Sequence, residues 1–383
     1  MQFDLIEDTY VDFEDLANCV YAPWQNPVQF IPVPKVQPQH IVFDKSFASF
    51  KAYPETQDNE AKPFTSMSGW FMNMPNIQNV AGFENIYNGI TDFSLTFCIF
   101  TGRINSDEIL DYNNSNDGAV LDLERFKQDN LTNVMGTFSN SSFTKITIPK
   151  GFAPKATRFG ATLNVPVLGD IYMSLFYGCK ASELKILGTI GTGVKDFTGL
   201  FSGCVNLKTF DDASMRQIDF SQAENIDMLF EQSGFASITI PDSLKKSSNI
   251  NSMYRTFAFE SVTKEIDLTG LNTSKIEDLS ELFIQSLSLT SVNLSGLNFS
   301  SVKNMSKMFY SCVSLLSVDL SSLDLSSVEN TSYMFSSYSE FAEKGQLTTI
   351  KFPKEPNKIF KSLKNTEGMF GRCIALHTID SIN

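Results

Sequence analysis

The sequence contains very few residues that usually serve as catalytic bases at neutral pH. Only two histidines occur in its 383 residues, His40 and His377, and they lie at opposite ends of the chain. Serine and cysteine nucleophiles are commonly activated by a histidine within hydrogen-bond reach. A Ser–His or Cys–His pair is therefore not expected. We predict a protein that is not an enzyme and that binds no cofactor.

Long apolar runs are also missing. No stretch of 18 apolar residues occurs, so the sequence predicts no transmembrane helix. Residues 1–34 contain no lysine or arginine and no continuous apolar segment. A secretory signal peptide, by contrast, has a basic start followed by an apolar core. We therefore expect no signal peptide, lipoprotein motif or membrane insertion.

Positive charge is scarce. The chain has 30 Lys and Arg residues against 43 Asp and Glu residues, which gives a formal net charge of −13. An acidic protein is repelled by the phosphates of nucleic acids and by anionic lipid headgroups. Nucleic acid and anionic membranes are therefore disfavoured as partners, whereas proteins and surface glycans remain open.

Phenylalanine, in contrast, is abundant, with 34 residues. Eleven of them occur inside the same local pattern, and the intervals from Phe257 to Phe283, Phe309 and Phe335 are each 26 residues. A fixed period of this length is typical of repeat proteins. The eleven residues are Phe71, Phe97, Phe138, Phe176, Phe201, Phe230, Phe257, Phe283, Phe309, Phe335 and Phe370.

Each repeat combines two apolar spacings. In the repeat around Phe309, apolar residues lie seven, four and one positions before the Phe, and six, nine and eleven positions after it. The first spacing is typical of a short helical or 3₁₀ turn, and the second of a short strand such as residues 317–320. One such coil cannot bury its own apolar face, so coils must stack. The fold prediction is a leucine-rich-repeat-like solenoid of the α/β class, with about eleven coils of roughly 26 residues and a parallel sheet.

A column of short polar residues lies five positions before the phenylalanines. Side-chain oxygens of these residue types can accept a hydrogen bond from a free backbone N–H at the start of a turn or helix. We interpret the column as caps rather than as a ligand-binding ladder, and Ile171 is its one exception. Its members are Ser66, Asp92, Asn133, Asp196, Asn225, Ser252, Asp278, Asn304, Asn330 and Asn365.

The repeats resemble a known family, the BspA-type leucine-rich repeats of bacterial surface proteins. The resemblance covers about residues 60–383 and implies a curved solenoid used for adhesion or recognition, without catalysis. Likeness of fold alone is a weak guide to the particular partner. The segments that carry it most clearly are residues 276–294, 302–320, 323–328 and 363–379.

The chain divides into two parts in this interpretation. Residues 1–38 form an acidic, proline-rich arm or cap, and residues 39–383 form the solenoid. Longer intervals between repeats indicate insertions near residues 105–130, 151–168 and 336–346, and insertions in repeat proteins often meet partners.

The arm must be extended, because repeated proline forbids a helix and favours polyproline II. It either caps the first coil or docks onto another subunit. Its candidate docking residues are Trp24, Phe30, Ile31, Pro32 and Pro34.

A further segment, residues 111–122, has acidic and amide oxygens at alternate positions. The spacing departs from a calcium loop, and the terminal bidentate Glu is absent. A polar insertion is the favoured interpretation, with calcium binding as the alternative.

The outward residues of the predicted strands form a candidate binding face. This row is polar and lacks the aromatic anchors that dominate tight interfaces, so ordinary solvation is its alternative interpretation. The row consists of Thr147, Lys185, Asp211, Thr239, Asp267, Asn293, Asp319, Lys351 and Asp380.

Four of the six cysteines, Cys179, Cys204, Cys312 and Cys373, lie three residues after a repeat phenylalanine. They occupy one structural column, in which neighbouring coils often carry Ser, Phe or Met. Buried free thiols are favoured over disulfides or a metal site.

The sequence thus predicts a non-enzymatic leucine-rich-repeat protein with a recognition, adhesion or structural surface. We expect it to be a subunit of a larger protein assembly, such as a virion head or tail decoration or fibre, on the surface of that particle. The alternatives are a free-standing extracellular adhesin that binds a host protein or glycan, and an enzyme scaffold whose chemistry lies in the insertions.

Overall fold

The structure is a computed structural model, and it describes most of the repeat region. The described residues are 2–3, 11–12, 40–45, 51–52, 62–63, 65–99 without 73 and 75, 103–105, 108–109, 119–208 without 166–168, 212–338, 340 and 343–380. They belong to two compact units, one of residues 1–193 with 210–218 and one of residues 194–209 with 219–383. Within the described ranges no helix has the length and apolarity needed to cross a membrane.

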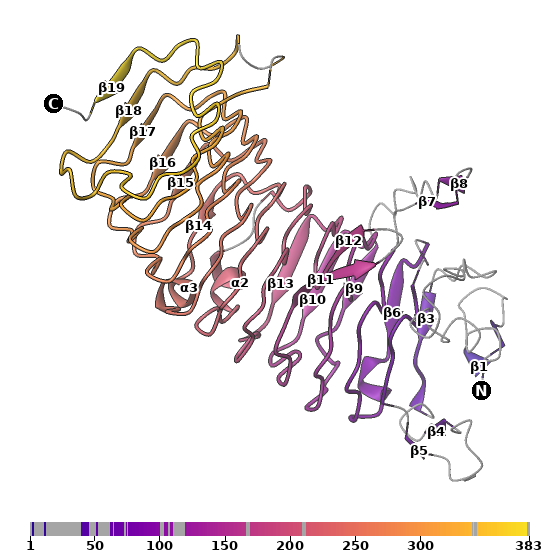
Figure 1. The fold of residues 1–383 in the computed structure, drawn as a ribbon. Coiled ribbons are helices and arrows are strands. Elements are labelled where there is room, and N and C mark those ends of the chain that lie inside the picture. Colours follow the sequence, from indigo (N-terminus) through magenta and orange to yellow (C-terminus); the bar gives the residue numbers. More distant parts are fainter. Residues whose placement is uncertain are drawn as a thin grey trace. The chain divides into compact units, whose positions relative to one another are not determined.

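The first unit contains a five-stranded parallel sheet (Figure 1). Its central positions Ile41, Val80, Leu121 and Ile146 follow one another in register across four neighbouring strands and are buried, because alternate residues of a strand point to the same face. In spatial order the strands are β13 (Glu183–Ile186), β10 (Lys145–Ile148), β9 (Val120–Asp122), β6 (Asn79–Ala81) and β3 (His40–Val42).

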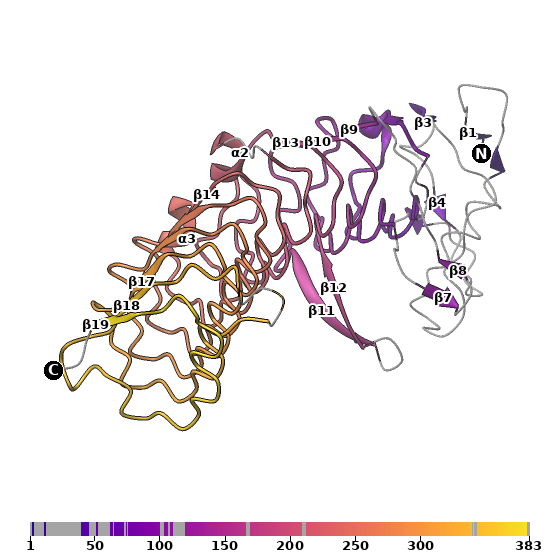
Figure 2. The ribbon, with the colours of Figure 1, turned by 90° about the horizontal axis from the view of Figure 1, so that it is seen from above.

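An antiparallel hairpin projects from this unit, away from the five-stranded sheet (Figure 2). Its strands are β11 (Gly160–Val165) and β12 (Gly169–Ser174), so part of the insertion predicted at residues 151–168 lies in it. Ile171, the one exception in the polar column, is a residue of β12 and pairs with Leu163. The hairpin therefore replaces the turn that a capping residue starts in the other coils.

The remaining elements of the first unit are short. Three two-residue or three-residue strand pairs are antiparallel: β1 (Gln2–Phe3) with β2 (Val11–Asp12), β4 (Lys51–Ala52) with β5 (Lys62–Pro63), and β7 (Arg103–Asn105) with β8 (Glu108–Ile109). Two helical elements that lie wholly within the described residues are η3 (Phe83–Asn85) and α2 (Asp212–Arg216).

The second unit contains two parallel three-stranded sheets. The first consists of β14 (Ile238–Thr239), β15 (Glu265–Asp267) and β16 (Ser291–Asn293). The second consists of β17 (Ser317–Asp319), β18 (Thr349–Lys351) and β19 (Thr378–Asp380). A short helix, α3 (Asp242–Lys246), follows β14. The predicted strand at residues 317–320 is thus confirmed as β17.

The repeat phenylalanines form a stacked column in each unit. Neighbouring rings of Phe71, Phe97, Phe138 and Phe176 in the first unit lie 5.3–6.1 Å apart at 10–22°. In the second unit the column runs from Phe201 to Phe370, with neighbours 5.3–6.1 Å apart at 1–16°. Such pairs contribute about 0.5–1.5 kcal/mol beyond the burial of their area.

The segment around each phenylalanine is a run of β-turns, so the predicted helical turn is wrong there. In the coil of Phe309, Lys307 and Ser311 have φ values of 54° and 58°, which a right-handed helix does not allow. The N–H of Tyr310 donates to the carbonyl of Lys307, whereas the N–H of Phe309 donates to Met334 in the next coil. Bonds within a coil and bonds between coils therefore alternate.

This left-handed backbone recurs at fixed places in the repeat. Two residues before the phenylalanine it occurs at Gly69, Leu95, Gly136, Gly199, Met228, Arg255, Glu281, Lys307, Tyr333 and Gly368. Two residues after it, the same conformation occurs at Asn140, Gly178, Gly203, Gln232, Phe259, Gln285, Ser311 and Arg372. Glycine adopts positive φ at no steric cost, which explains why both positions of the Phe201 coil are glycines.

The polar column starts these turns. Asn304 Oδ1 accepts a hydrogen bond of 3.1 Å from the N–H of Ser306, and Asp278 Oδ1 accepts one of 2.7 Å from Ser280. The ten column residues make this bond to the N–H two positions later at 2.7–3.3 Å. Within each unit, neighbouring column residues also form parallel backbone bridges. Their side chains therefore have the geometry of caps.

Candidate functional surface

The strand row predicted as a binding face is assembled sheet by sheet. Thr239 lies beside Asp267, and Asp267 beside Asn293. Asp319, Lys351 and Asp380 form a second set in register, and Thr147 pairs with Lys185 in the first unit. Asp211 lies outside the described residues.

Most acidic and amide side chains of this row are engaged with their own chain. Asp267 Oδ1 accepts bonds from the N–H and hydroxyl of Thr269 at 3.0 and 2.5 Å. These bonds hold the pKa of Asp267 below its ordinary value. Asn293 and Asp319 make the equivalent bonds to Ser295 and Ser321. The row therefore caps the turns that follow the strands, and this favours the structural interpretation over ligand binding.

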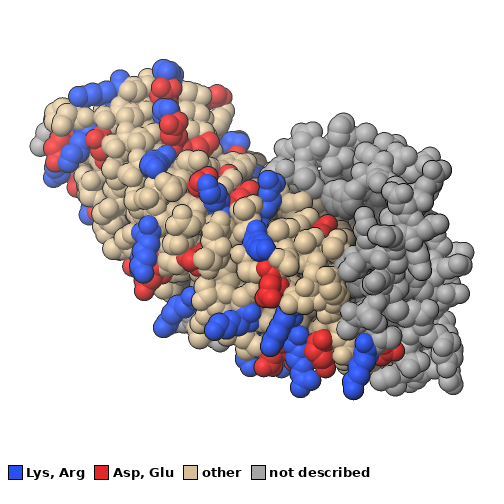
Figure 3. All heavy atoms as spheres, turned by 90° about the horizontal axis from the view of Figure 1, so that it is seen from below, with Lys and Arg blue, Asp and Glu red and all other residues tan. Residues whose placement is uncertain are grey.

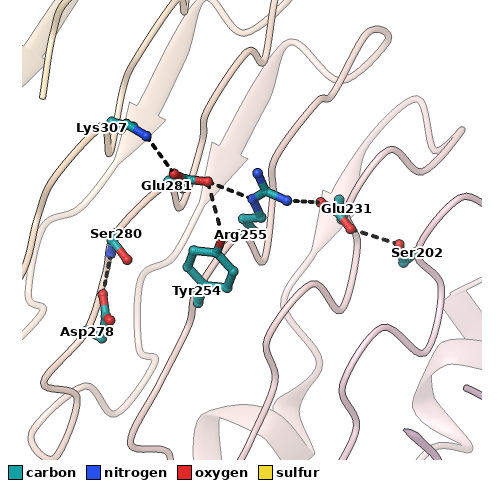
Figure 4. Close-up of polar contacts among 8 residues, drawn as sticks. All are labelled: Ser202, Glu231, Tyr254, Arg255, Asp278, Ser280, Glu281 and Lys307. Atoms are coloured by element: carbon teal, nitrogen blue, oxygen red, sulfur yellow. Dashed lines mark hydrogen bonds and ion pairs between the residues drawn. The ribbon is translucent and has the colours of Figure 1, made fainter. Parts of the chain in front are cut away.

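A different surface of the second unit concentrates charged and aromatic groups. It is formed by the residues that flank the phenylalanine column, where the turns direct side chains outward. One part of it is a charged row across successive coils, composed of Ser202, Glu231, Arg255, Glu281 and Lys307 (Figure 4).

Arg255 lies at the centre of the charged row. Its Nε donates to Glu281 Oε2 at 2.7 Å, and its Nη1 lies 3.6 Å from Glu231 Oε1. Lys307 Nζ reaches the other oxygen of Glu281 at 3.2 Å, and the Ser202 hydroxyl donates to Glu231 at 3.1 Å (Figure 4). Both carboxylates are mostly buried, with 14% of each side chain exposed. Each carboxylate thus has a cationic partner from a neighbouring coil.

Electrostatics distinguishes the two carboxyl groups. Burial acts to raise the pKa of Glu281, but the bonds and charges of Arg255 and Lys307 outweigh it, so this pKa lies below its ordinary value. Burial dominates at Glu231 and raises its pKa, against the effects of Arg255 and Ser202. Of these two carboxyl groups, Glu281 is therefore the one whose ionised form is stabilised by its surroundings.

Aromatic rings surround Arg255. Its guanidinium lies 5.3 Å from the ring centres of Tyr254 and Phe259, within the range of a cation–π contact. The Tyr254 hydroxyl donates to Glu281 at 3.3 Å. These contacts hold the arginine on the surface of the turns.

The aromatic groups continue along the following coils. Tyr310 and Tyr338 pack edge to face with ring centres 4.8 Å apart, and Tyr338 is 42% exposed. The Tyr333 hydroxyl bonds to Glu367, and Arg372 donates to the carbonyl of Ser337. We call the set Tyr254, Arg255, Phe259, Tyr310, Tyr333, Tyr338 and Arg372 the aromatic–arginine surface.

This surface was not among the sites predicted from the sequence. Its residues lie within three positions of the repeat phenylalanines, and those that precede the phenylalanine, Tyr254, Arg255 and Tyr333, lie in the predicted helical turn. The residue types could have indicated this surface, because tyrosine and arginine are enriched among the residues that contribute most to the binding free energy of protein interfaces.

Charges of both signs are interspersed on the described part of the face drawn in Figure 3. Ion pairs join neighbouring coils at the position six residues before the phenylalanine. These pairs are Lys195 with Glu224 at 2.9 Å, Lys303 with Glu277 at 2.7 Å, and Lys364 with Glu329 at 2.8 Å. Exposed pairs stabilise little, and we assign them to coil pairing.

The column cysteines are free thiols in the structure. Cys179, Cys204 and Cys312 are buried and Cys373 is half-buried. Burial raises the pKa of the Cys312 thiol to about 12, and its Sγ donates to the carbonyl of Phe283 at 2.9 Å. A thiol in this state is a poor nucleophile.

Other predicted sites lie outside the described residues. These are the docking residues Trp24, Phe30, Ile31, Pro32 and Pro34, and the oxygen-rich residues 111–117. Across the part of the chain that is described, no group of three His, Cys, Asp or Glu side chains is placed to hold a metal ion.

Comparison with known proteins links the second unit to a family. Residues 251–372 match the model described as "Mycoplasma protein of unknown function, DUF285". The match covers less than half of the chain, and it includes the aromatic–arginine surface. No curated protein and no solved structure matches the chain.

Proposed function

We propose that the chain is a non-enzymatic, leucine-rich-repeat-like solenoid of the BspA type that recognises a protein, or a glycan on a surface. The aromatic–arginine surface is the observation that supports this role. Tyrosine and arginine offer large contact areas together with hydrogen bonds, and such residues carry most of the free energy of many interfaces.

The construction of the turns makes this surface suitable for binding. The phenylalanine column and the bonds between coils fix the backbone beneath it, and cation–π and ion-pair contacts restrain Arg255. Ordering flexible side chains upon binding costs about 0.5–1.5 kcal/mol for each side chain. A pre-ordered surface avoids part of this cost.

We propose two biological settings in which the protein would have this role. In the first, the protein is a subunit of a larger assembly, such as a virion decoration or fibre, and residues 1–38 attach it. In the second, it is a free-standing adhesin at a cell surface. The family match supports the second setting, since it relates the coils to proteins of a cellular organism. Deleting residues 1–38 separates them, because only assembly requires the arm.

The test is capture of partners from surface extracts of cells and particles of the source organism and its host. Three biotinylated forms are compared by quantitative mass spectrometry: wild type, Tyr310→Ala/Tyr338→Ala, and the strand-row control Thr239→Lys/Lys351→Glu. We expect a saturable partner that the tyrosine variant loses and the control retains. Loss in the control alone would place recognition on the strand row and overturn the proposal.

A further inference from the structure

One coil of the second unit departs from the repeat between its turns and its strand. Strands β17 and β18 pair in register, with Ser317 beside Thr349. Ser317 follows its repeat phenylalanine by eight residues and Thr349 follows Phe335 by fourteen, so the Phe335 coil has six additional residues. Three residues after Phe335, Tyr338 is 42% exposed, whereas Cys312 at the same place in the preceding coil is buried. The Phe335 coil therefore lacks a core side chain at this position.

A small pocket lies where that side chain is missing. It has a volume of about 30 Å³, and it is lined by Cys312 of the preceding coil and Cys373 of the following coil. Leu315 and Leu347 contribute to its apolar walls. Because a described coil lies on either side of it, the pocket arises from the additional residues of the Phe335 coil.

Three serines also line the pocket, and one hydroxyl among them has no partner. Ser311 Oγ accepts a bond from the N–H of Tyr338 at 3.0 Å and lies 3.3 Å from Ser337 Oγ. Ser336 is 6% exposed, and its hydroxyl makes no hydrogen bond to a described residue. A buried hydroxyl without a partner costs free energy, so the Ser336 hydroxyl is a group that a ligand would satisfy.

Arg372 supplies a positive charge beside this hydroxyl. It lines the pocket and donates to the carbonyl of Ser337 at 3.5 Å, and it makes no ion pair with a described residue. Arg255, in contrast, has both Glu231 and Glu281 as partners. A guanidinium has five N–H donors and binds carboxylates through two parallel bonds. Arg372 thus retains donors for a carboxylate from outside the chain.

The size and the walls of the pocket restrict the ligand. One water molecule needs about 10–15 Å³ on this measure, so the pocket holds about two atoms of that size. This suits the two oxygens of a carboxylate and is too small for a sugar ring. The apolar walls suit a methylene stem, and a carboxylate can be buried when it is paired and hydrogen-bonded. An aspartate or glutamate side chain has these properties.

We propose that this pocket receives an aspartate or glutamate side chain of a protein partner, and that Arg372 and the Ser336 hydroxyl bind its carboxylate. The inference rests on the proposed recognition function, because Arg372 belongs to the aromatic–arginine surface. It narrows the partner to a protein that presents an acidic side chain. Such a side chain would lie beside Tyr338, whose N–H bonds to Ser311 at the pocket.

A single blocked amino acid tests the pocket without the partner. Full-length protein with labelled leucine methyl groups is titrated with N-acetyl-glutamate methylamide and followed by NMR, with N-acetyl-glutamine methylamide as the neutral control. We expect saturable shifts of the Leu315 and Leu347 methyl resonances with the glutamate compound only. Arg372→Gln should abolish them. Ser336→Ala should weaken binding at least about tenfold, the usual effect of losing one hydrogen bond to a charged group.

Arg158→Gln is the matched control, because it removes the same charge from an exposed arginine of the first unit. It should leave the titration unchanged. Equal melting temperatures confirm that the variants are folded, and the comparison of the two compounds on wild type requires no variant.

Three results would overturn the proposal. They are an absence of saturable shifts with the glutamate compound, equal binding of the glutamine compound, and binding that Arg372→Gln retains. The methyl glycoside of N-acetylneuraminic acid is titrated in parallel, and tighter binding of this sugar at Arg372 would assign the pocket to an acidic glycan instead.

Partner capture separates this inference from the proposed function. If the glutamate compound binds but Tyr310→Ala/Tyr338→Ala retains every partner, the recognition surface is wrong and the carboxylate site stands. If the tyrosine variant loses a partner that Arg372→Gln retains, the surface stands and the pocket is not part of it.

Discussion

Glu260 is a fully buried carboxyl group with three hydrogen-bonding contacts. Its Oε1 accepts bonds from the N–H and hydroxyl of Ser233 at 3.1 and 3.0 Å, and its Oε2 lies 3.1 Å from Thr263 Oγ. The Thr263 hydroxyl also lies 2.8 Å from the carbonyl of Phe235, which can only accept. Thr263 has one proton to donate, which is shared between these two acceptors. Burial outweighs the hydrogen bonds from Ser233 and Thr263 and raises the pKa of Glu260 to about 8.

This residue predicts a pH dependence of stability. The folded state holds the proton more tightly than the unfolded state, whose pKa is near the ordinary 4.5. The stabilisation of the folded state by this bound proton is therefore complete below pH 4.5 and is lost as pH rises through about 8. Between the two pKa values, the free energy of unfolding falls by about 1.4 kcal/mol for each pH unit. We expect the free energy of unfolding of wild type to fall from pH 5 to pH 8 relative to Glu260→Gln, which mimics the protonated form. If urea titrations give wild type and Glu260→Gln the same dependence of unfolding free energy on pH, the assignment is wrong.

The phenylalanine column predicts a second effect at this scale. Phe309 is 2% exposed and stacks on Phe283 and Phe335 at 5.3 and 5.6 Å. Phe309→Ala should destabilise the chain by about 3–5 kcal/mol through the lost burial and the cavity. Phe370→Ala is the matched control, because Phe370 is 37% exposed and stacks on one side only in the described chain. Equal losses in denaturant melts would show that the column is not the core.

At the scale of the element, the strands were predictable and the turns were not. The alternation around Val318 and Ile350 specifies a strand with one buried face. The three- and four-residue spacing before Phe309 is shared by a helix and by a run of β-turns whose alternate N–H groups bond to the next coil. Glycines at both flanking positions of Phe201, Gly199 and Gly203, were the signal against a helix, because glycine weakens helices and favours left-handed backbone.

The capping column yields a prediction for these turns. Asn304→Ala removes the acceptor for the N–H of Ser306 and should cost about 0.5–2 kcal/mol in unfolding free energy. Asn304→Asp retains an acceptor oxygen, as Asp278 does in the preceding coil, and should cost less. Chemical denaturation of both variants measures the difference. If alanine and aspartate behave alike, the side chain is not a cap.

At the scale of the whole molecule, the repeat period was visible in the sequence, whereas the aromatic–arginine surface that we propose for recognition was not. The strand row was predicted as a candidate binding face because its residues alternate with buried ones. In the structure, Asp267, Asn293 and Asp319 accept bonds from their own turns. Tyr310 and Tyr338 lie 28 residues apart, and their contact depends on how the coils stack. The residue pattern within a single coil does not indicate this contact between coils.

Hydrogen–deuterium exchange of the full-length protein, with and without a captured partner, tests the recognition surface most directly. Our account predicts that the partner slows exchange in peptides that contain residues 254–259, 310 and 333–338, and leaves strands β15 and β17 unchanged. Protection confined to β15 and β17, with no change around Tyr254 and Tyr338, would contradict it.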